Sequence, residues 1–293
     1  MSKIHSIFLL VSLFVIPAHS FGQGLDTSKV DSILGRSGTK MGDIYKVGFP
    51  RSDLHVTLDG IVLRPGLALG SWGAFAGTNS DAMVMGDLVL LEGEVNLVMV
   101  KLREAGFEIT AIHNHLLNER PHVMYMHYMG HGTLENLAKS LRSALEASKT
   151  PFGKPAARPN PTETSPAFVK ITEEVLGRKG SFNNGVLGFG IPRAGIVTHK
   201  GRIIPPSLGV AEAINFQEAG KDRVATAGDF VLTADEVTPV ISALEAHNIQ
   251  VTALHNHMLD ETPRLFFMHF WGTGEARSVA EGIKAALARI QTK

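Results

Sequence analysis

ITAIHNHLLNERPHVMYMHYMGHG, residues 109–132, occurs a second time with conservative changes as VTALHNHMLDETPRLFFMHFWGTG, residues 251–274. The offset between the two copies is 142 residues. Three histidines and a glutamate keep their places in both copies: His113, His115, His127 and Glu119 in the first, and His255, His257, His269 and Glu261 in the second. Three histidines repeated at one spacing, within apolar segments, indicate two sites of one design.

The duplication extends over most of the 293 residues. Leu34-Gly35-Arg36, Pro50-Arg51, Gly86-Asp87 and Glu94-Val95 recur at the same offset. A period of this length is far longer than a solenoid repeat, so each copy is expected to be a domain with its own core. We place the first repeat domain at residues 28–148 and the second at 167–293.

Each copy shows the same order of predicted elements. The front parts, residues 54–76 and 196–216, have short β-type segments separated by turn residues. Behind the second front, residues 229–232 predict a strand, 233–247 a helix that starts with a capping box, 249–257 and 265–271 two strands, and 274–290 a closing helix. The predicted fold class is therefore α+β, with a β-rich front followed by a β-α-β-β-α unit in each of two tandem homologous domains.

Two segments lie outside these domains. Lys149 to Pro166 contains five prolines, which predicts an extended surface linker, with a structured loop around the domains as the alternative. Lys3, the apolar segment Ile7 to Ile16 and the small residues before position 20 indicate a secretory signal peptide over residues 1–20. We therefore expect a periplasmic or secreted protein, with no transmembrane anchor after cleavage.

Composition limits the chemistry. The chain has no cysteine, so any metal must be held by nitrogen and oxygen ligands. It has 28 basic and 28 acidic side chains, without the clustered lysines and arginines that a nucleic acid requires, so no nucleic-acid partner is expected.

The histidine spacing is compatible with a metal site. Residues two apart in a strand project to the same face, so His255 and His257 are predicted to lie side by side, about 7 Å apart. An antiparallel hairpin that turns near Pro263 would place His269 opposite one of them, and the first copy has the same arrangement. Three imidazoles with an open position suit zinc, and also copper, nickel or iron. Glu119 and Glu261, in the turns, are candidates for a fourth ligand or a general base in metal-assisted hydrolysis.

A structural interpretation of the same residues is the alternative. A His-x-His pair in an apolar strand is commonly a buried pair that hydrogen-bonds to backbone carbonyls, and duplication would copy it. Asn114 and Asn256 project to the opposite face and are expected to tie a helix or loop to the sheet. Trp72 and Trp271 are candidates for stacking on a sugar ring, or for ordinary core packing.

The segment LEAHNIQVTALHNHMLDETPRLFFMHFWGTG, its twin, and the Leu-Gly-Arg opening of each copy resemble the LppY/LpqO family of exported bacterial proteins. The resemblance covers both copies. It implies an extracytoplasmic location and a duplicated domain, and it brings no activity or cofactor. Members that give the family its name look like lipoproteins, and this chain differs from them because it has no cysteine.

Two functions follow from the sequence. The first is an extracytoplasmic metalloprotein that holds a divalent transition metal in each repeat, either for hydrolysis of an unknown small-molecule or envelope ligand or only for binding and storage of the metal. The second is a non-catalytic cell-envelope module that binds glycan or protein, in which the histidines are structural or respond to pH.

Overall fold

The computed structural model describes residues 24–153 and 165–293. In this part of the chain the first repeat forms a six-stranded antiparallel sheet of order β1-β2-β5-β6-β8-β7. Its strands are β1 (Thr39–Met41), β2 (Ile44–Pro50), β5 (Gly70–Gly77), β6 (Ala82–Leu91), β7 (Glu108–His113) and β8 (Val123–Gly132). A short hairpin and four helices complete it: β3 (Thr57–Leu58), β4 (Ile61–Val62), α1 (Thr27–Leu34), α2 (Pro65–Ala68), α3 (Glu92–Glu104) and α4 (Leu134–Glu146).

The second repeat has the same plan, with sheet order β15-β17-β14-β13-β10-β9. Its strands are β9 (Ser181–Asn183), β10 (Val186–Pro192), β13 (Ala211–Glu218), β14 (Arg223–Leu232), β15 (Gln250–His255) and β17 (Phe266–Glu275). The remaining elements are α5 (Ala167–Leu176), the strands β11 (Val197–His199), β12 (Arg202–Ile204) and β16 (Glu261–Thr262), a 3-10 turn at Pro206–Leu208, α6 (Ala234–Glu245) and α7 (Ala276–Leu287). The predicted α+β class, with a β-α-β-β-α unit in each of two homologous repeats, is confirmed.

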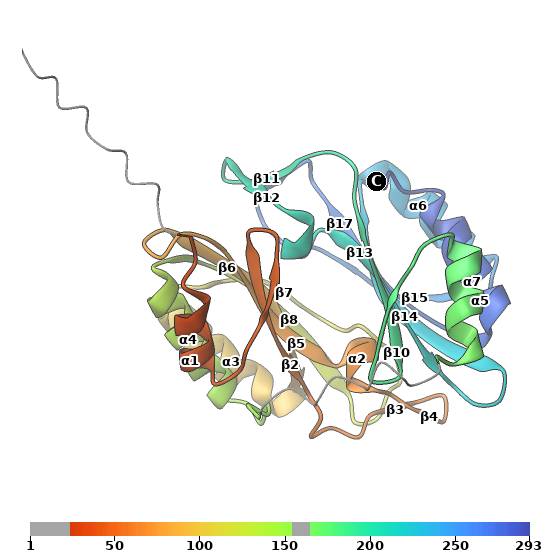
Figure 1. Ribbon diagram of the computed structural model, residues 1–293, viewed down its shortest axis with the longest axis horizontal. Coiled ribbons are helices and arrows are strands. Elements are labelled where there is room, and N and C mark those ends of the chain that lie inside the picture. Colours follow the sequence, from red (N-terminus) through yellow and green to blue (C-terminus); the bar gives the residue numbers. More distant parts are fainter. Residues whose placement is uncertain (1–23, 154–164) are drawn as a thin grey trace, which may run out of the picture.

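The two repeats pack with their sheets facing each other and their helices outside (Figure 1). Each repeat buries a core of its own between sheet and helices, as expected. Two further cores mix residues of both repeats, for example Met85 with Phe267, and Tyr125 with Trp271. This packing explains why β6 and β17 are buried on both faces, a pattern that a sheet with one wet face would not show.

Local sequence features set the element ends as predicted. The Thr233 N–H donates to the Glu236 carboxylate at 2.8 Å, one of the two bonds of a capping box, and α6 begins at the next residue. Glu236 also receives the buried Arg193 guanidinium at 2.6 Å. Arg51 and Glu94 form the equivalent pair at 2.7 Å in the first repeat. The repeated Pro-Arg and Glu-Val motifs therefore connect the second strand of each sheet to the helix that follows its fourth.

The front segments cross to the opposite repeat. The Asn215 amide donates to the Leu67 carbonyl at 3.1 Å, which fixes α2 against the second sheet. In the other direction, the Arg202 guanidinium of the β11–β12 hairpin binds Asp81 at 2.9 Å. These reciprocal contacts hold the two sheets in one relative orientation, and that orientation positions the site below.

The predicted signal peptide lies outside the described residues, as does most of the predicted linker, residues 154–164. Within the described ranges, no helix combines the length and apolar character needed to cross a membrane.

Candidate metal centre

The histidines of each repeat come from its last hairpin. His255 ends β15, His257 follows it, and His269 lies in β17. The register differs from the predicted one: His269 pairs with Ala253, and His255 pairs with Phe267. The predicted pairing of His269 with His255 or His257 is therefore wrong by two residues or more, because the segment between His255 and Phe266 is longer than a tight turn. Residues directly opposite each other in an antiparallel pair have their side chains on the same face of the sheet. His255 and His269 therefore still lie on one face.

The six histidines of both repeats form one cluster between the sheets. Their rings meet across the interface in three pairs. His113 stacks on His255 and His115 on His269, with centroids 3.7 Å and 3.6 Å apart, and His127 lies tilted against His257 with centroids 3.8 Å apart. The two predicted histidine sets therefore lie against each other rather than apart. Sequence spacing cannot reveal this, since it depends on which faces of the two sheets pack together.

The asparagine of each His-Asn-His motif joins the repeats. The Asn114 amide donates to the Thr252 carbonyl at 2.9 Å, and the Asn256 amide donates to the Thr110 carbonyl at 2.7 Å. Both asparagines are structural, as expected, but their partners belong to the opposite repeat. They tie the two histidine-bearing strands edge to edge.

Backbone carbonyls fix the orientation of the imidazoles. A ring Nδ1–H donates to a carbonyl oxygen in four of them: His127 to Gly86 at 3.2 Å, His269 to Gly228 at 2.9 Å, His257 to Gly209 at 3.0 Å, and His255 to Asn256 at 3.2 Å. A neutral imidazole that donates from Nδ1 keeps a lone pair on Nε2. Histidines that bind metal typically donate their other ring N–H to a carbonyl or carboxylate in this way.

Aromatic neighbours also hold the rings in place. His115 stacks on Tyr125 and His257 on Phe267, each with centroids 3.4 Å apart. Burial lowers the pKa of all six histidines, and neighbouring histidines lower the pKa of His113 and His115 further. The imidazoles are therefore neutral at physiological pH, the form that binds a metal.

Two aspartates complete the cluster. Asp87 pairs with His127 across neighbouring strands, and Asp229 pairs with His269 in the same way. A carboxylate oxygen of Asp87 lies 3.2 Å from His115 Nε2, and one of Asp229 lies 3.0 Å from His257 Nε2. Neither aspartate was predicted as a site residue, although Gly86-Asp87 recurs in the sequence as Gly228-Asp229.

Many polar atoms of this cluster lack a partner. Of the fourteen buried side-chain nitrogen and oxygen atoms without a hydrogen bond in the described residues, seven belong to it. They are Asp87 Oδ1, His113 Nδ1, His127 Nε2, Asp229 Oδ1, His255 Nε2, His257 Nε2 and His269 Nε2. The Nε2 of His257 lies near Asp229 without the alignment of a hydrogen bond. Unpartnered lone pairs that converge in a buried space are what an ion requires, and leaving them bare is costly.

Three groups have donor atoms close enough together to hold an ion, each within 4.8 Å of one another: His113 with His115 and His269, His113 with His127 and His255, and Asp229 with His255 and His257. The first two groups mix ligands from both repeats. The first and the third share no residue, so these two groups do not compete for a ligand.

The two glutamates predicted as ligand or base lie elsewhere. Both are buried in their turns. Glu119 accepts the Val123 N–H at 3.1 Å, and Glu261 accepts the Leu265 N–H at 3.0 Å. Neither belongs to the three groups above. The structure thus does not bring them to the histidines, and the carboxylates that lie there are Asp87 and Asp229.

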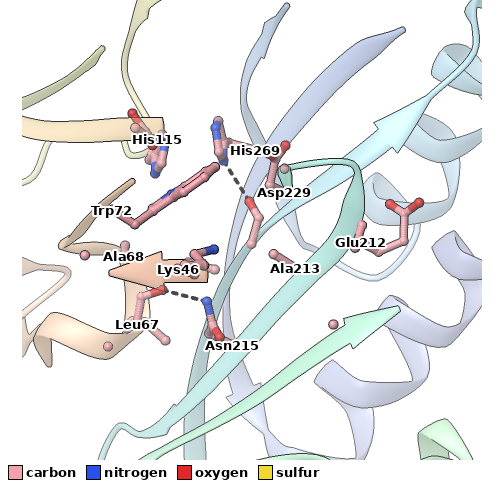
Figure 2. A pocket seen from close by; sticks show the side chains of 18 of the residues that line it. Lys46, Leu67, Ala68, Trp72, His115, Glu212, Ala213, Asn215, Asp229 and His269 are labelled. Carbon is pink, nitrogen blue, oxygen red and sulfur yellow. Dashed lines mark hydrogen bonds and ion pairs between the residues drawn. The ribbon is translucent and has the colours of Figure 1, made fainter. Parts of the chain in front are cut away.

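A cavity of about 380 Å³ opens beside the cluster, between the two sheets (Figure 2). Both aspartates and four of the histidines line it: His115, His127, His257 and His269. Trp72 and Lys46 line the wall from the first repeat, while Ala211 and Ala213 line the wall from the second. Of the two tryptophans, Trp72 faces this cavity and Trp271 is buried in a shared core.

The fold and site define a duplicated α+β protein in which two homologous repeats enclose one cluster of metal-ligand residues. A family model described as Domain of Unknown Function (DUF1259) matches residues 28–147 and again residues 170–289. The chain belongs to this family and contains its domain twice.

Other comparisons add little. No curated protein matches the chain. Among solved structures, EtuB from Clostridium kluyveri is similar at 11% identity and a TM-score of 0.19, over 86% of this chain and 90% of that one. The trimeric bacterial microcompartment shell protein PduB is similar at 10% identity and a TM-score of 0.20, over 86% and 89%. Likenesses at these TM-scores carry no argument about fold or function.

Proposed function

We propose that this protein binds a divalent transition metal, as one or two ions, in the histidine cluster between its repeats. The observation that carries the proposal is the set of imidazole Nε2 atoms whose Nδ1–H groups donate to backbone carbonyls while Nε2 itself has no hydrogen-bond partner. Purely structural histidines would use both ring nitrogens.

The donor set suits zinc best, with copper as the next choice, since it consists of neutral imidazoles and carboxylates without sulfur. A divalent ion there would act as a Lewis acid on a molecule bound in the adjoining cavity. The residues of the chain would orient that molecule and exclude bulk water. Metal-dependent hydrolysis is the reaction class that such a centre would serve.

Export to the periplasm or outside the cell is part of the proposal, supported by the sequence of residues 1–20. Membership of the LppY/LpqO group is likewise a proposal, supported by the ALHNHM and MHFWG strings.

The first test is elemental analysis of the purified protein after growth in metal-supplemented medium and after reconstitution with zinc or copper. We expect one to two equivalents per chain. The matched control is His247→Ala, because His247 is an exposed residue of the turn after α6 and is not one of the clustered histidines. Absence of retained metal would refute the proposal and favour the alternative of an envelope module with structural histidines.

A double-mutant cycle tests whether the site is joint. His115 and His269 come from different repeats and belong to one group of donors. If they share an ion, His115→Ala and His269→Ala will each weaken zinc binding, and the double variant will lose much less than the sum of the two losses. Independent, additive losses would mean one separate site per repeat.

A further inference from the structure

The cavity beside the metal centre has unequal walls, although the two repeats share one fold. Lys46 pairs with Thr39 in the first sheet, and Gly188 pairs with Ser181 at the same place in the second. Trp72 pairs with Asp87 in the first sheet, and Ala213 pairs with Asp229 at the same place in the second. A large cationic and aromatic wall therefore faces a wall of small residues.

Lys46 is the cation of this cavity. Its ammonium nitrogen lies 3.9 Å from the centre of the Trp72 ring. Within the described part of the chain no carboxylate forms an ion pair with it, and Asp87 is the charged group that acts on its pKa. Burial lowers the pKa of Lys46 to about 8 and the Asp87 charge opposes that change, so the amine is still mostly protonated at neutral pH. A buried ammonium without an anion is costly, and a ligand that supplies one would remove that cost.

Trp72 brings the cation close to the histidines. A side chain on Gly209 would approach the tip of the Trp72 ring to 3.2 Å and His257 Nδ1 to 3.7 Å, so the indole and the imidazole meet at one point of the wall. Figure 2 shows Lys46, Trp72, His115 and His269 around the same space, while Glu212 points away from it. Lys46 and the metal ligands therefore face one cavity.

Charge balance indicates the kind of molecule that fits. Without metal, the two aspartates outweigh Lys46, and the cavity disfavours an anion. A divalent ion would reverse this balance, since two positive charges and Lys46 then exceed the two aspartates. Glu212 also lines the cavity, but burial raises the pKa of its carboxyl well above the usual value and favours the neutral form. The volume of about 380 Å³ is in the range of small-molecule sites.

We propose that the cavity binds a small organic oxyanion, with its acid group between Lys46 and the metal centre and its apolar part against the small-residue wall of the second repeat. This inference rests on the proposed metal binding. It names the substrate class of that site: a small carboxylate or phosphate ester.

Calorimetric titration of the zinc-loaded full-length protein tests it, with benzoate, phenyl phosphate and the neutral benzamide as probes. We expect at least one of the two anions to bind, and Lys46→Met to weaken it roughly tenfold to a hundredfold. Benzamide should bind weakly and equally in both proteins. The control is Lys40→Met, since Lys40 is exposed on the neighbouring strand β1 and should not affect any probe.

The outcomes separate this inference from the metal proposal. Zinc content and thermal midpoint of Lys46→Met should match the wild type, which excludes misfolding. If zinc is retained and the anions bind no better than benzamide, or bind Lys46→Met equally well, the oxyanion site is refuted and the metal proposal stands. If no zinc is retained, the metal proposal fails, and benzoate titration of the metal-free protein decides whether Lys46 binds an anion without it.

Discussion

Acid should destabilise the metal-free protein steeply, because the folded chain keeps imidazoles neutral that the unfolded chain would protonate. Burial holds the pKa of five cluster histidines well below its ordinary value of about 6.5: His113, His115, His127, His257 and His269. Since the folded pKa values are lowered, the stability from these groups is fully present above pH 6.5. It is lost as the pH falls below that value.

The size of the effect follows from linkage. At pH 5.0, 1.5 pH units below the unfolded pKa, each neutral histidine costs the folded state about 2 kcal/mol. Five of them cost about 10 kcal/mol, which compares with a total stability of about 5–15 kcal/mol for an ordinary domain. We therefore expect the metal-free protein to unfold by about pH 5.

Urea unfolding in the presence of a chelator, followed by circular dichroism between pH 7.5 and 5.5, measures this dependence. The slope at pH 5.5 should correspond to uptake of about four to five protons on unfolding. His257→Gln combined with His269→Gln should lower that number by about two. His247→Gln, which changes an exposed residue, should keep the number found for the wild type within one proton. A wild-type slope of one proton or fewer would refute the reasoning that the cluster is buried and neutral.

Three further predictions concern the surroundings of the cluster. Asn256→Ala leaves the Thr110 carbonyl without its amide donor and should cost about 1–3 kcal/mol by urea unfolding, with weaker zinc binding; unchanged stability would mean that this cross-repeat bond is dispensable. Gly228→Ala places a methyl group against the Ala213 carbonyl oxygen, so the Gly228 carbonyl that orients His269 must move. Zinc affinity should then fall about tenfold to a hundredfold, and an affinity equal to that of the wild type would contradict this. Glu261→Gln weakens a bond to a backbone N–H and should cost about 1 kcal/mol while metal content stays the same, whereas loss of metal would restore its predicted role as a ligand.

The sequence was sufficient for the parts of the fold that depend on local patterns. Helix α6 was predicted from its apolar spacing and the Thr233 to Glu236 capping pattern, and its observed bounds lie within the predicted ones. The order of strands and helices after the front of each repeat followed from the same kind of evidence. These features are set by residues close together in the chain, so periodicity is enough to find them.

The site could be predicted only as far as one sheet determines it. Strand alternation predicted that His255, His257 and His269 share a face, and this part was right. The hairpin register was wrong, because the length of the loop between the two strands leaves no mark in the spacing of the histidines. Asp229 was missed because its partner His269 is forty residues later, on a neighbouring strand. Residue spacing within one repeat carries no information on how the two sheets pack against each other.

Joint ligation has a physical consequence for how the repeats depend on each other. Two of the three donor groups draw on both repeats. An ion in either of those two groups would be held fully only when the sheets are docked, so the free energy of its binding would also stabilise the interface.

The unequal walls then explain how a nearly symmetric centre can act on an asymmetric molecule. Two identical repeats would carry Trp72 twice, and the second indole would fill the space that Ala213 leaves open. Divergence at this position and at Gly188 opens the cavity on one side and leaves a single ammonium group, Lys46, on the other. A bound oxyanion therefore has one favourable orientation relative to the metal ligands. The residues that the two repeats share form the histidine cluster, and the residues that differ between them, Lys46 and Trp72 against Gly188 and Ala213, set the orientation of the bound molecule.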